Sequence, residues 1–459
     1  MYFLSQNKLL CSCFVLFVAF FSLVVRSDAE ELFPLYPAIK TNVLFWEDVY
    51  SRYTTRQGIL HDKDNLAIVY TVVDLVDWNT RGAARINKKM IKLARQRYKK
   101  ILTYLASGKK PVTDEQKRVA SLFPRHSRQA FKKARNNIRL QIGQKDRFLQ
   151  GVVRSGAYMP TIKKIFRIYN LPPELAYLPH VESSFNPNAH SKAGAAGLWQ
   201  FTRSTGREYM TINNVIDERY DPYFATQSAA VFLKGNYELL DSWPLAITAY
   251  NYGRSGMLRA KKKMGGYEKI FNIHRTRLFK FASRNFYPEF LAALRIAQRL
   301  ETDKSVIVDR PEATISVRMN GYASAPDLLR YFRIYKEDFS RLNPALRKSV
   351  LTGKKYIPKN FLVRLPASDR TRDLAAAIPS SIYRLKQIRD NVYIVRRGDT
   401  AGAISRRYGI SVSELILANA LNNRATIRIG QKLKIPGKTR VTVSTNIVIL
   451  ETQSKNKPR

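Results

Sequence analysis

The chain has 459 residues, a length that suits two or three compact domains, each with a hydrophobic core of its own. Hydrophobic residues make up 45% of the sequence, which excludes an intrinsically disordered chain. The 79 Lys and Arg residues outnumber the 35 Asp and Glu residues, and the resulting formal charge of +44 attracts polyanions to the surface. Nucleic acid, anionic lipid and acidic polymers of a cell envelope all fit this charge.

The segment 1–27 has the pattern of a signal peptide or an N-terminal anchor. Lys8 precedes an apolar run over residues 9–25, whose length lies between that of a signal core and that of a membrane-spanning helix. Cleavage and retention of this segment both remain open. Cys11 and Cys13 lie inside it, so the rest of the chain has no disulfide, cysteine nucleophile or thiolate metal site. For an exported protein, nucleic acid becomes a minor alternative as the partner of the basic charge.

The segment 28–129 is predicted to be a basic helical region. Residues 81–147 include 21 Lys or Arg and three acidic residues, a net charge of +18. Two helical apolar patterns run through this stretch, one formed by Ile86, Met90, Leu93, Ile101 and Leu105 and the next by Phe131, Ala134, Ile138 and Ile142. The basic residues form either a solvated helix face or a surface that holds the protein on an anionic envelope polymer or membrane.

The texture of the chain changes near residue 310. Residues 130–308 read as amphipathic helices between short Gly, Pro, Asn and Ser clusters, with no run of alternating strands, so the fold class is mainly α. Short β-prone runs surround helical stretches in 311–366. A polar interval over 367–390 then leads to a module over 391–437, and the chain ends in a polar tail over 438–459.

An acidic residue stands out in the stretch LAYLPHVESSF. At helical spacing Leu175, Leu178 and Phe185 fall on one apolar stripe, which Leu171 extends, and Glu182 lies among them. Burial of a carboxylate in apolar surroundings disfavours its charged form and raises its pKa. Glu182 is therefore expected to be paired, protonated or needed for function.

Small, aromatic and amide residues follow this glutamate. Residues 193–197 are all Ala or Gly and allow close approach of a ligand or a helix, and Trp199 and Gln200 follow directly. Tyr250, Asn251 and Tyr252 come farther along in AITAYNYGRSG. A flat ring beside an amide suits a sugar, although each residue taken singly is as well explained by core packing.

The stretches ELAYLPHVESSFNP, AGAAGLWQFTRSTG and AYNYG resemble, in order and spacing, three motifs of the soluble lytic transglycosylase family. The resemblance covers about residues 130–300 and implies a lysozyme-like helical catalytic domain. It also implies that Glu182 protonates the oxygen between N-acetylmuramic acid (MurNAc) and N-acetylglucosamine (GlcNAc), then deprotonates the muramyl C6 hydroxyl to leave a 1,6-anhydro end. The substrate-binding residues that it implies are Gln200, Tyr250, Asn251, Ser191, Ser183, Trp199 and Tyr252, and Ser183 is expected to orient the carboxylate.

The sequence departs from the family at two places. Tyr252 stands where the family has a small residue, and ASRNFYPEF lacks the acidic residue and Thr of a later motif, which leaves a substitute role for Tyr287 open. The family needs no second catalytic carboxylate, and Glu208, Asp217 and Asp221 are interpreted as structural. No cofactor or metal is implied, and His180 is interpreted as a packing neighbour of Glu182.

Residues 391–436 resemble a LysM module with the order strand, helix, helix, strand. The resemblance implies that Gly398, Asp399, Thr400 and Asn419 line a groove for GlcNAc-containing chains, although Asp399 and Asn419 are also explained as helix caps. A similar order of predicted helix, helix and strand over 313–366 indicates a degenerate second copy. This copy is expected to serve as scaffold because it lacks the Gly-Asp-Thr turn.

The leading interpretation is a monomeric enzyme of the periplasm or cell envelope that binds peptidoglycan glycan strands and cleaves them without hydrolysis. A goose-type lysozyme with the same single glutamate would deliver water in place of the C6 hydroxyl. A catalytically silent peptidoglycan-binding protein is the alternative from another class. Nucleic-acid binding is weaker still, because charge alone rarely holds nucleic acid at physiological salt.

Overall fold

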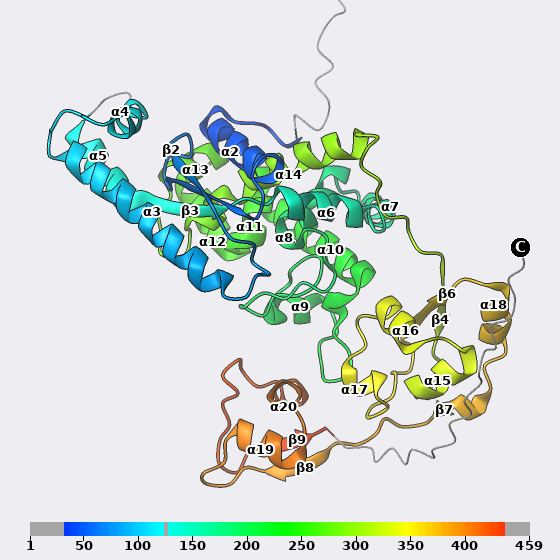
Figure 1. Cartoon of the computed structure of the whole chain (residues 1–459). Helices are drawn as coiled ribbons and strands as arrows, with labels where there is room; N and C mark the ends of the chain where they lie inside the picture. The colour runs from blue at the N-terminus through cyan, green and yellow to red at the C-terminus, as the bar shows by residue number, and fades with distance from the viewer. Residues whose placement is uncertain (1–31, 124–126, 437–459) are drawn as a thin grey trace, which may run out of the picture. The chain divides into compact units, whose positions relative to one another are not determined.

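The computed structural model describes residues 32–123 and 127–436, and its fold is mainly helical, which confirms the predicted class (Figure 1). The predicted signal segment 1–27 and the tail 438–459 lie outside the described residues. The chain divides into two compact units. The first holds the described residues up to Thr202 together with Pro222–Pro311, and the second holds Arg203–Asp221 together with the described residues from Glu312 onward. The change of texture near residue 310 therefore marks a structural boundary.

A three-stranded antiparallel sheet lies in the first unit, where the sequence predicted helices alone. Its strand order is β2-β1-β3, formed by β1 (Gln57–Asp62), β2 (Val69–Asp74) and β3 (Ile138–Ile142). Because β1 and β3 pair across the expected boundary at residue 130, the basic region and the region after it belong to one unit. The prediction of a purely helical segment over 28–129 was wrong.

The predicted helix through Ile138 and Ile142 was also wrong. Helix α5 (Arg128–Asn137) ends before Ile138, and the following residues pair with β1. Residues four apart share one face of a helix, but they also share one face of a strand. The apolar spacing fitted both structures, and pairing with a strand far back in the sequence decided between them.

Helix α3 (Ala83–Ala106) carries much of the basic charge, and only half of its predicted apolar stripe is buried. Ile101 and Leu105 belong to a core cluster that also contains residues of the sheet, α4 (Asp114–Ser121) and α5. Ile86 and Leu93, in the N-terminal half of the helix, are 41% and 56% exposed. The stripe therefore packs only where α3 meets α5 and the sheet.

Helix α14 (Phe281–Thr302) is central to the first unit. It packs against helices from both ends of the unit, α2 (Lys40–Ser51), α6 (Lys145–Ser155), α8 (Leu178–Ser183) and α11 (Trp243–Tyr252). The other helices of this unit are α7 (Met159–Ile168), α10 (Pro222–Leu240), α12 (Arg254–Met264) and α13 (Tyr267–Ile273). Most residues from Ser283 to Ala297 of α14 are buried. This helix therefore lies in the core of the unit, and α2, α6, α8 and α11 pack against it.

The second unit takes in a segment that the sequence analysis had assigned to the first domain. Residues 203–221, which include α9 (Arg203–Tyr209), join this unit through buried ion pairs. Asp217, 1% exposed, pairs with Arg219 at 2.9 Å and with Arg347 at 2.6 Å, and Asp221 pairs with Arg364. These contacts agree with the structural interpretation of the two aspartates.

Two segments of the second unit have the order strand, helix, helix, strand, with the outer strands paired antiparallel. One consists of β4 (Thr314–Arg318), α15 (Ala325–Phe332), α16 (Lys336–Leu342) and β6 (Leu362–Pro366). The other consists of β8 (Asn391–Ile394), α19 (Ala401–Tyr408), α20 (Val412–Asn419) and β9 (Lys432–Ile435). The first segment also contains α17 (Lys348–Leu351) and is followed by α18 (Asp369–Ala376), and the short strands β5 (Tyr322–Ala323) and β7 (Tyr383–Arg384) pair with each other.

An asparagine joins the second helix to the closing strand in both segments. The side-chain amide of Asn343 donates to the carbonyl oxygens of Phe339 and Arg364, at 2.9 and 2.8 Å, and its oxygen accepts the Arg364 N–H at 2.8 Å. Asn419 makes the same three bonds with Leu415 and Lys434, at 2.9, 2.9 and 2.7 Å. The shared contacts support the predicted second copy.

Replacing Asn343 with Ala should loosen the 314–366 segment, because the backbone groups of Arg364 lose their partners. We expect a loss of about 1 to 3 kcal/mol of local stability, and amide hydrogen exchange over 362–366 should be roughly 5- to 150-fold faster. Exchange measured by mass spectrometry on the whole chain tests this, with Asn423→Ala in an exposed turn as the control. Equal exchange in the two variants would remove Asn343 from any role in joining α16 to β6.

Candidate active site

Glu182 lies near the end of α8, a helix of only six residues. The 3₁₀ turn Pro173–Tyr177 precedes this helix, and Ser184 and Phe185 leave it with φ angles of 50° and 53°. The single helical stripe predicted over 171–185 is therefore divided among three backbone conformations. Leu175, Leu178 and Phe185 are nevertheless all fully buried, so the chain surrounds the glutamate with apolar side chains by another geometry.

An aromatic cluster holds α8 in place. His180, 1% exposed, stacks on Phe148 at 5.0 Å and on Tyr177 at 6.0 Å, and Phe185 lies 4.5 Å from its ring. Neither ring nitrogen has a hydrogen-bond partner in the described part of the chain. Burial and the charge of Arg154 lower the pKa of His180 to about 3, so its ring is neutral. His180 packs as the sequence analysis expected and does not serve as a base.

Glu182 as a whole residue is partly exposed, while its carboxyl is surrounded by other groups of the fold. Burial of the carboxyl and the nearby charge of Glu289 raise the pKa of Glu182 to about 8. A glutamate with this pKa carries its proton at neutral pH and can act as a general acid.

Glu289 is a second acidic residue at this site, and the sequence analysis missed it. It lies on α14, and the Tyr50 hydroxyl of α2 donates a hydrogen bond of 2.9 Å to its carboxylate. Burial raises the pKa of Glu289 to about 7, while the bond from Tyr50 and the charge of Arg139 oppose that rise. The signal was present in ASRNFYPEF, where this glutamate stands among Phe286, Tyr287 and Phe290, as Glu182 stands among Leu and Phe residues.

Two residues of the AYNYG motif lie at the end of α11 near Glu182. The Tyr250 hydroxyl donates to the Trp199 carbonyl at 2.8 Å, and burial and the charge of Glu182 raise the pKa of Tyr250 well above its ordinary value. Asn251 is exposed, and its side-chain oxygen accepts a bond of 2.8 Å from the Ser283 hydroxyl on α14. The structure thus brings Tyr250 near Glu182 and holds the exposed Asn251 through its side-chain oxygen.

Three other predicted site residues hold the loop over 189–202. The Ser183 hydroxyl donates to the Leu198 carbonyl at 2.8 Å, and the Gln200 amide donates to the Gly197 carbonyl at 2.9 Å. The Ser191 hydroxyl accepts the Ala195 N–H at 3.0 Å. The expectation that Ser183 orients the Glu182 carboxylate was wrong, because its hydroxyl bonds to backbone oxygens instead.

Trp199 is fully buried, and its predicted role as a platform for a sugar ring was wrong. Its indole N–H donates to the Thr226 hydroxyl at 2.9 Å, and its ring packs against Phe166 at 5.5 Å. Only the backbone of Trp199 reaches toward the site, through the bond from Tyr250. Trp199 is therefore a core residue, which is the alternative that the sequence left open.

Tyr252 and Tyr287 are both engaged elsewhere. The Tyr252 hydroxyl lies 3.3 Å from the ring of His274 and from the hydroxyl of Thr276, and its own ring meets Phe279 edge-on. Tyr287 is fully buried, and its hydroxyl donates to the Pro34 carbonyl at 2.9 Å. Tyr287 therefore does not supply the hydroxyl contact that the sequence lacks.

The predicted sugar-binding residues of the C-terminal module use their polar atoms within the fold. Asp399 accepts hydrogen bonds of 2.7 Å from the Tyr393 hydroxyl and from the Arg396 N–H, and Thr400 caps α19. Gly398 has a φ of 85°, which favours glycine, and Asn419 joins α20 to β9 as described above. Thr400 is the N-cap of α19 and Ala420 the C-cap of α20, so the explanation of Asp399 and Asn419 as helix caps was wrong, although both side chains bond within the fold.

The described residues contain no cluster of His, Cys, Asp and Glu arranged to hold a metal ion. Over the same residues, every helix is too short or too polar to span a bilayer.

Comparison with known families decides the domain content. The family model "Transglycosylase SLT domain" matches residues 160–272, and the model "LysM domain" matches residues 393–436. The chain contains a transglycosylase SLT domain and a LysM domain. The SLT match includes Glu182, Gln200, Tyr250 and Asn251, and it ends before Glu289.

Three individual proteins are similar to parts of the chain. The chain is 28% identical over 296 residues to membrane-bound lytic murein transglycosylase D of Escherichia coli K12, a match covering 62% of this chain and 64% of that protein. It is 51% identical over 47 residues to the uncharacterized lipoprotein YgeR of the same organism, covering 10% of this chain and 19% of that protein. A solved structure of an inactive mutant of lytic transglycosylase Slt from Pseudomonas aeruginosa aligns with 33% of this chain and 26% of that chain, at 20% identity and a TM-score of 0.27.

The electrostatic link between the two glutamates of the SLT domain region can be tested directly. Replacing Glu289 with Gln removes a negative charge that raises the pKa of Glu182, so Glu182 should release its proton at a lower pH than in the unchanged chain. Carbon-13 NMR titration of the glutamate carboxyls measures this, with Glu182→Gln assigning the resonance. The exposed Glu238→Gln is the control, and an unchanged Glu182 titration in Glu289→Gln would contradict the link.

Proposed function

We propose that the chain is a peptidoglycan lytic transglycosylase, which cleaves the MurNAc–GlcNAc β-1,4 bond without water and leaves 1,6-anhydro-MurNAc ends. One observation carries this proposal: Glu182 is a partly exposed residue with a carboxyl that is protonated at neutral pH, inside the matched SLT domain. The E. coli relative named a lytic murein transglycosylase supports the same activity.

The reaction needs one residue that gives and then takes a proton. Glu182 donates its proton to the glycosidic oxygen, the bond from that oxygen to the muramyl C1 breaks, and GlcNAc leaves as the alcohol. Positive charge then develops at C1 and on the ring oxygen, and the Glu182 carboxylate is close enough to stabilise it. The Glu182 carboxylate then takes the proton of the muramyl C6 hydroxyl, while the C6 oxygen forms a bond to C1. Glu182 ends the cycle protonated, and no cofactor takes part.

Neighbouring residues set up this cycle. Tyr250 joins α11 to the loop over 189–202 through its bond to the Trp199 carbonyl, so it positions that loop beside Glu182. Asn251 is held by Ser283 and keeps its amide nitrogen for the substrate. The charge of Glu289 favours the protonated form of Glu182 before the reaction begins. We assign substrate contact to Asn251 and Gln200 and positioning to Tyr250, Ser183 and Ser191.

The other parts of the chain fit an enzyme attached to its polymer. The LysM domain would bind GlcNAc-containing strands and keep the SLT domain on the wall, with the 311–366 segment as scaffold. The basic helices over 81–137 would add attraction to an anionic envelope polymer or membrane. An export segment over 1–27 and the words "membrane-bound" and "lipoprotein" in the names of the relatives support a place in the cell envelope.

Digestion of purified peptidoglycan tests the activity. The chain from residue 28 onward should release muramyl ends that are one water lighter than reducing ends, as mass spectrometry shows. Glu182→Gln should slow this release by about 10²- to 10⁴-fold, because a general acid contributes that much to the rate.

Glu238→Gln, an exposed change on α10, should leave the rate unchanged. Reducing ends in place of anhydro ends would establish a lysozyme-type hydrolase instead. Binding without cleavage by the unchanged chain would establish a peptidoglycan-binding protein and overturn the proposal.

Removal of the LysM domain tests the attachment. A chain that ends at residue 390 should still cleave soluble glycan fragments, because Glu182 and its surroundings lie outside the removed part. Its binding to insoluble peptidoglycan should fall by about tenfold or more, since one of two linked binding sites is lost. Sedimentation with insoluble peptidoglycan measures binding, and equal sedimentation of the two chains would contradict the role of the domain.

A further inference from the structure

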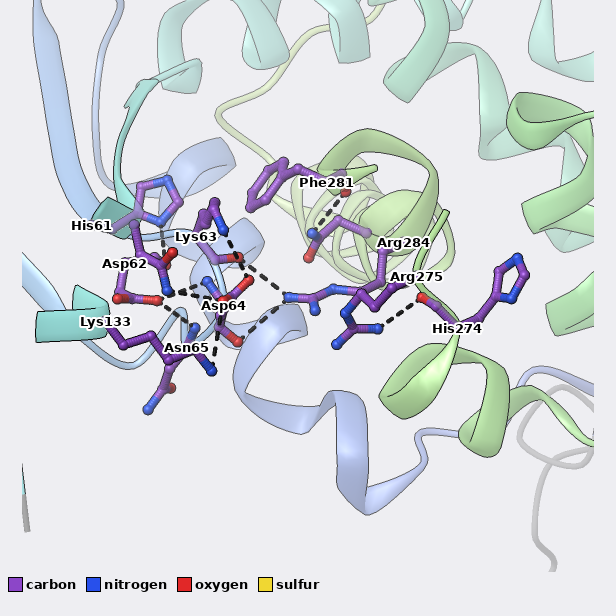
Figure 2. Close-up of polar contacts among 12 residues, drawn as sticks. His61, Asp62, Lys63, Asp64, Asn65, Lys133, His274, Arg275, Phe281 and Arg284 are labelled. Carbon is purple, nitrogen blue, oxygen red and sulfur yellow. Dashed lines mark hydrogen bonds and ion pairs between the residues drawn. The ribbon is translucent and has the colours of Figure 1, made fainter. Parts of the chain in front are cut away.

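A basic pocket lies where three segments of the first unit meet. The turn after β1 contributes Lys63 and Asp64, strand β3 contributes Arg139, and the approach to α14 together with its first turn contributes Arg275, Lys280 and Arg284. Figure 2 shows the turn and the start of α14 with their side chains facing one another. The cavity has a volume of about 320 Å³, enough for a small charged group.

The positive charge of this pocket is not neutralised by its own residues. Asp64 is the single acidic residue among the six charged residues that line it, and it already pairs with Lys63 at 3.6 Å and Lys133 at 3.8 Å. Asn137 adds a hydrogen bond of 2.9 Å to the same carboxylate. Five cations therefore face one carboxylate that is already occupied, and mutual repulsion makes an added anion favourable.

Arg284 has the strongest need for a partner. It is 8% exposed, and its Nε–H has no hydrogen-bond partner in the described part of the chain. One terminal nitrogen donates to the backbone oxygens of Lys63 and Asp64, at 3.3 and 3.4 Å (Figure 2), and the guanidinium lies 5.4 Å from the centre of the Phe271 ring. Burial and the charge of Arg275 lower the pKa of Arg284, and the charges of Asp64, Tyr267 and Asp62 oppose this without cancelling it. An anion in the cavity would accept a hydrogen bond from the unpartnered Nε–H and would stabilise the buried charge of Arg284.

The pocket adjoins the proposed active site through α14. Ser283, the residue before Arg284, bonds to Asn251, and the charge of Arg139 acts on Glu289. The guanidinium of Arg139 stacks at 4.0 Å over the ring of Phe281. A stacked guanidinium keeps its N–H edge available for a carboxylate.

We propose that this pocket binds a carboxylate of the stem peptide that muramyl residues carry in peptidoglycan. The inference rests on the proposed function, because it takes peptidoglycan as the substrate. A peptide that extends from a sugar bound at Asn251 would approach the pocket, because Ser283 bonds to Asn251 and directly precedes Arg284, and planar guanidinium groups suit a carboxylate. A membrane surface fits less well, because Arg284 is only 8% exposed.

Cleavage rates on two substrates test the proposal. Glycan strands with stem peptides are compared with the same strands after an amidase has removed the peptides. Arg284→Gln should lower kcat/KM about 10- to 100-fold on the peptide-bearing strands and leave the bare strands unaffected. Arg299→Gln, an exposed change on the same helix, should alter neither rate. Equal losses on both strands would show a structural role for Arg284 and overturn the proposal.

Binding separates failure of this proposal from failure of the proposed function. A free stem tetrapeptide, titrated calorimetrically into the full chain, should bind the unchanged protein and bind Arg284→Gln at least about tenfold more weakly. This result would support the pocket even if no strand is cleaved. The double variant Arg275→Gln with Lys280→Gln should also bind the peptide more weakly. Both residues are exposed, so this variant tests the pocket even if Arg284→Gln misfolds. Unchanged peptide affinity, or loss of binding only to phosphatidylglycerol vesicles, would overturn the proposal.

Discussion

The burial of the Glu182 carboxyl is the constraint on which the rest of the first unit depends. Taking a carboxyl out of water favours its neutral form, but only while the surrounding side chains keep water away. The helix that carries Glu182 has six residues, too few to be stable alone. The aromatic cluster around His180 and the hydrogen bonds of Ser183 and Tyr250 supply the order that α8 lacks. Much of the domain is therefore devoted to fixing one turn of chain.

Helix α14 connects these contacts to the N-terminal region. Within two turns it bonds to Asn251 through Ser283, lines the basic pocket with Arg284, reaches Pro34 through Tyr287 and pairs Glu289 with Tyr50. The partners of the last two residues lie in the first 50 residues of the chain, well outside the SLT match. The N-terminal region is thus part of the structure that sets the charge near Glu182, besides any role of its basic helices in attachment.

The sequence could locate Glu182 because a charged residue inside an apolar stretch is visible whatever the backbone does. The apolar residues around Glu182 are buried as the spacing predicted, although the backbone over this stretch is not one helix. Local pattern could not reveal the β1 and β3 pairing, since the two strands are separated by about 75 residues of mostly helical chain. Nor could it separate Trp199 as a platform from Trp199 as core, because burial depends on Thr226 and Phe166, which meet it only in the fold. Glu289 stands among Phe286, Tyr287 and Phe290 and therefore carries the same signal in the sequence.

Comparison of the two strand-helix-helix-strand segments shows which polar residues of the LysM domain serve its fold. Asn343 and Asn419 make the same three hydrogen bonds, and Ser324 caps α15 as Thr400 caps α19. Asn343 does this in a segment without a Gly-Asp-Thr turn, so the asparagine is required by the fold and carries no information about sugar. A polar residue that serves the fold in both copies is a weak candidate for recognition. The segment over 314–366 lacks the turn at 398–400, where the Asp399 carboxylate accepts the Arg396 N–H and the Asp399 N–H donates to the Arg396 carbonyl, so this turn is the feature that distinguishes the two segments.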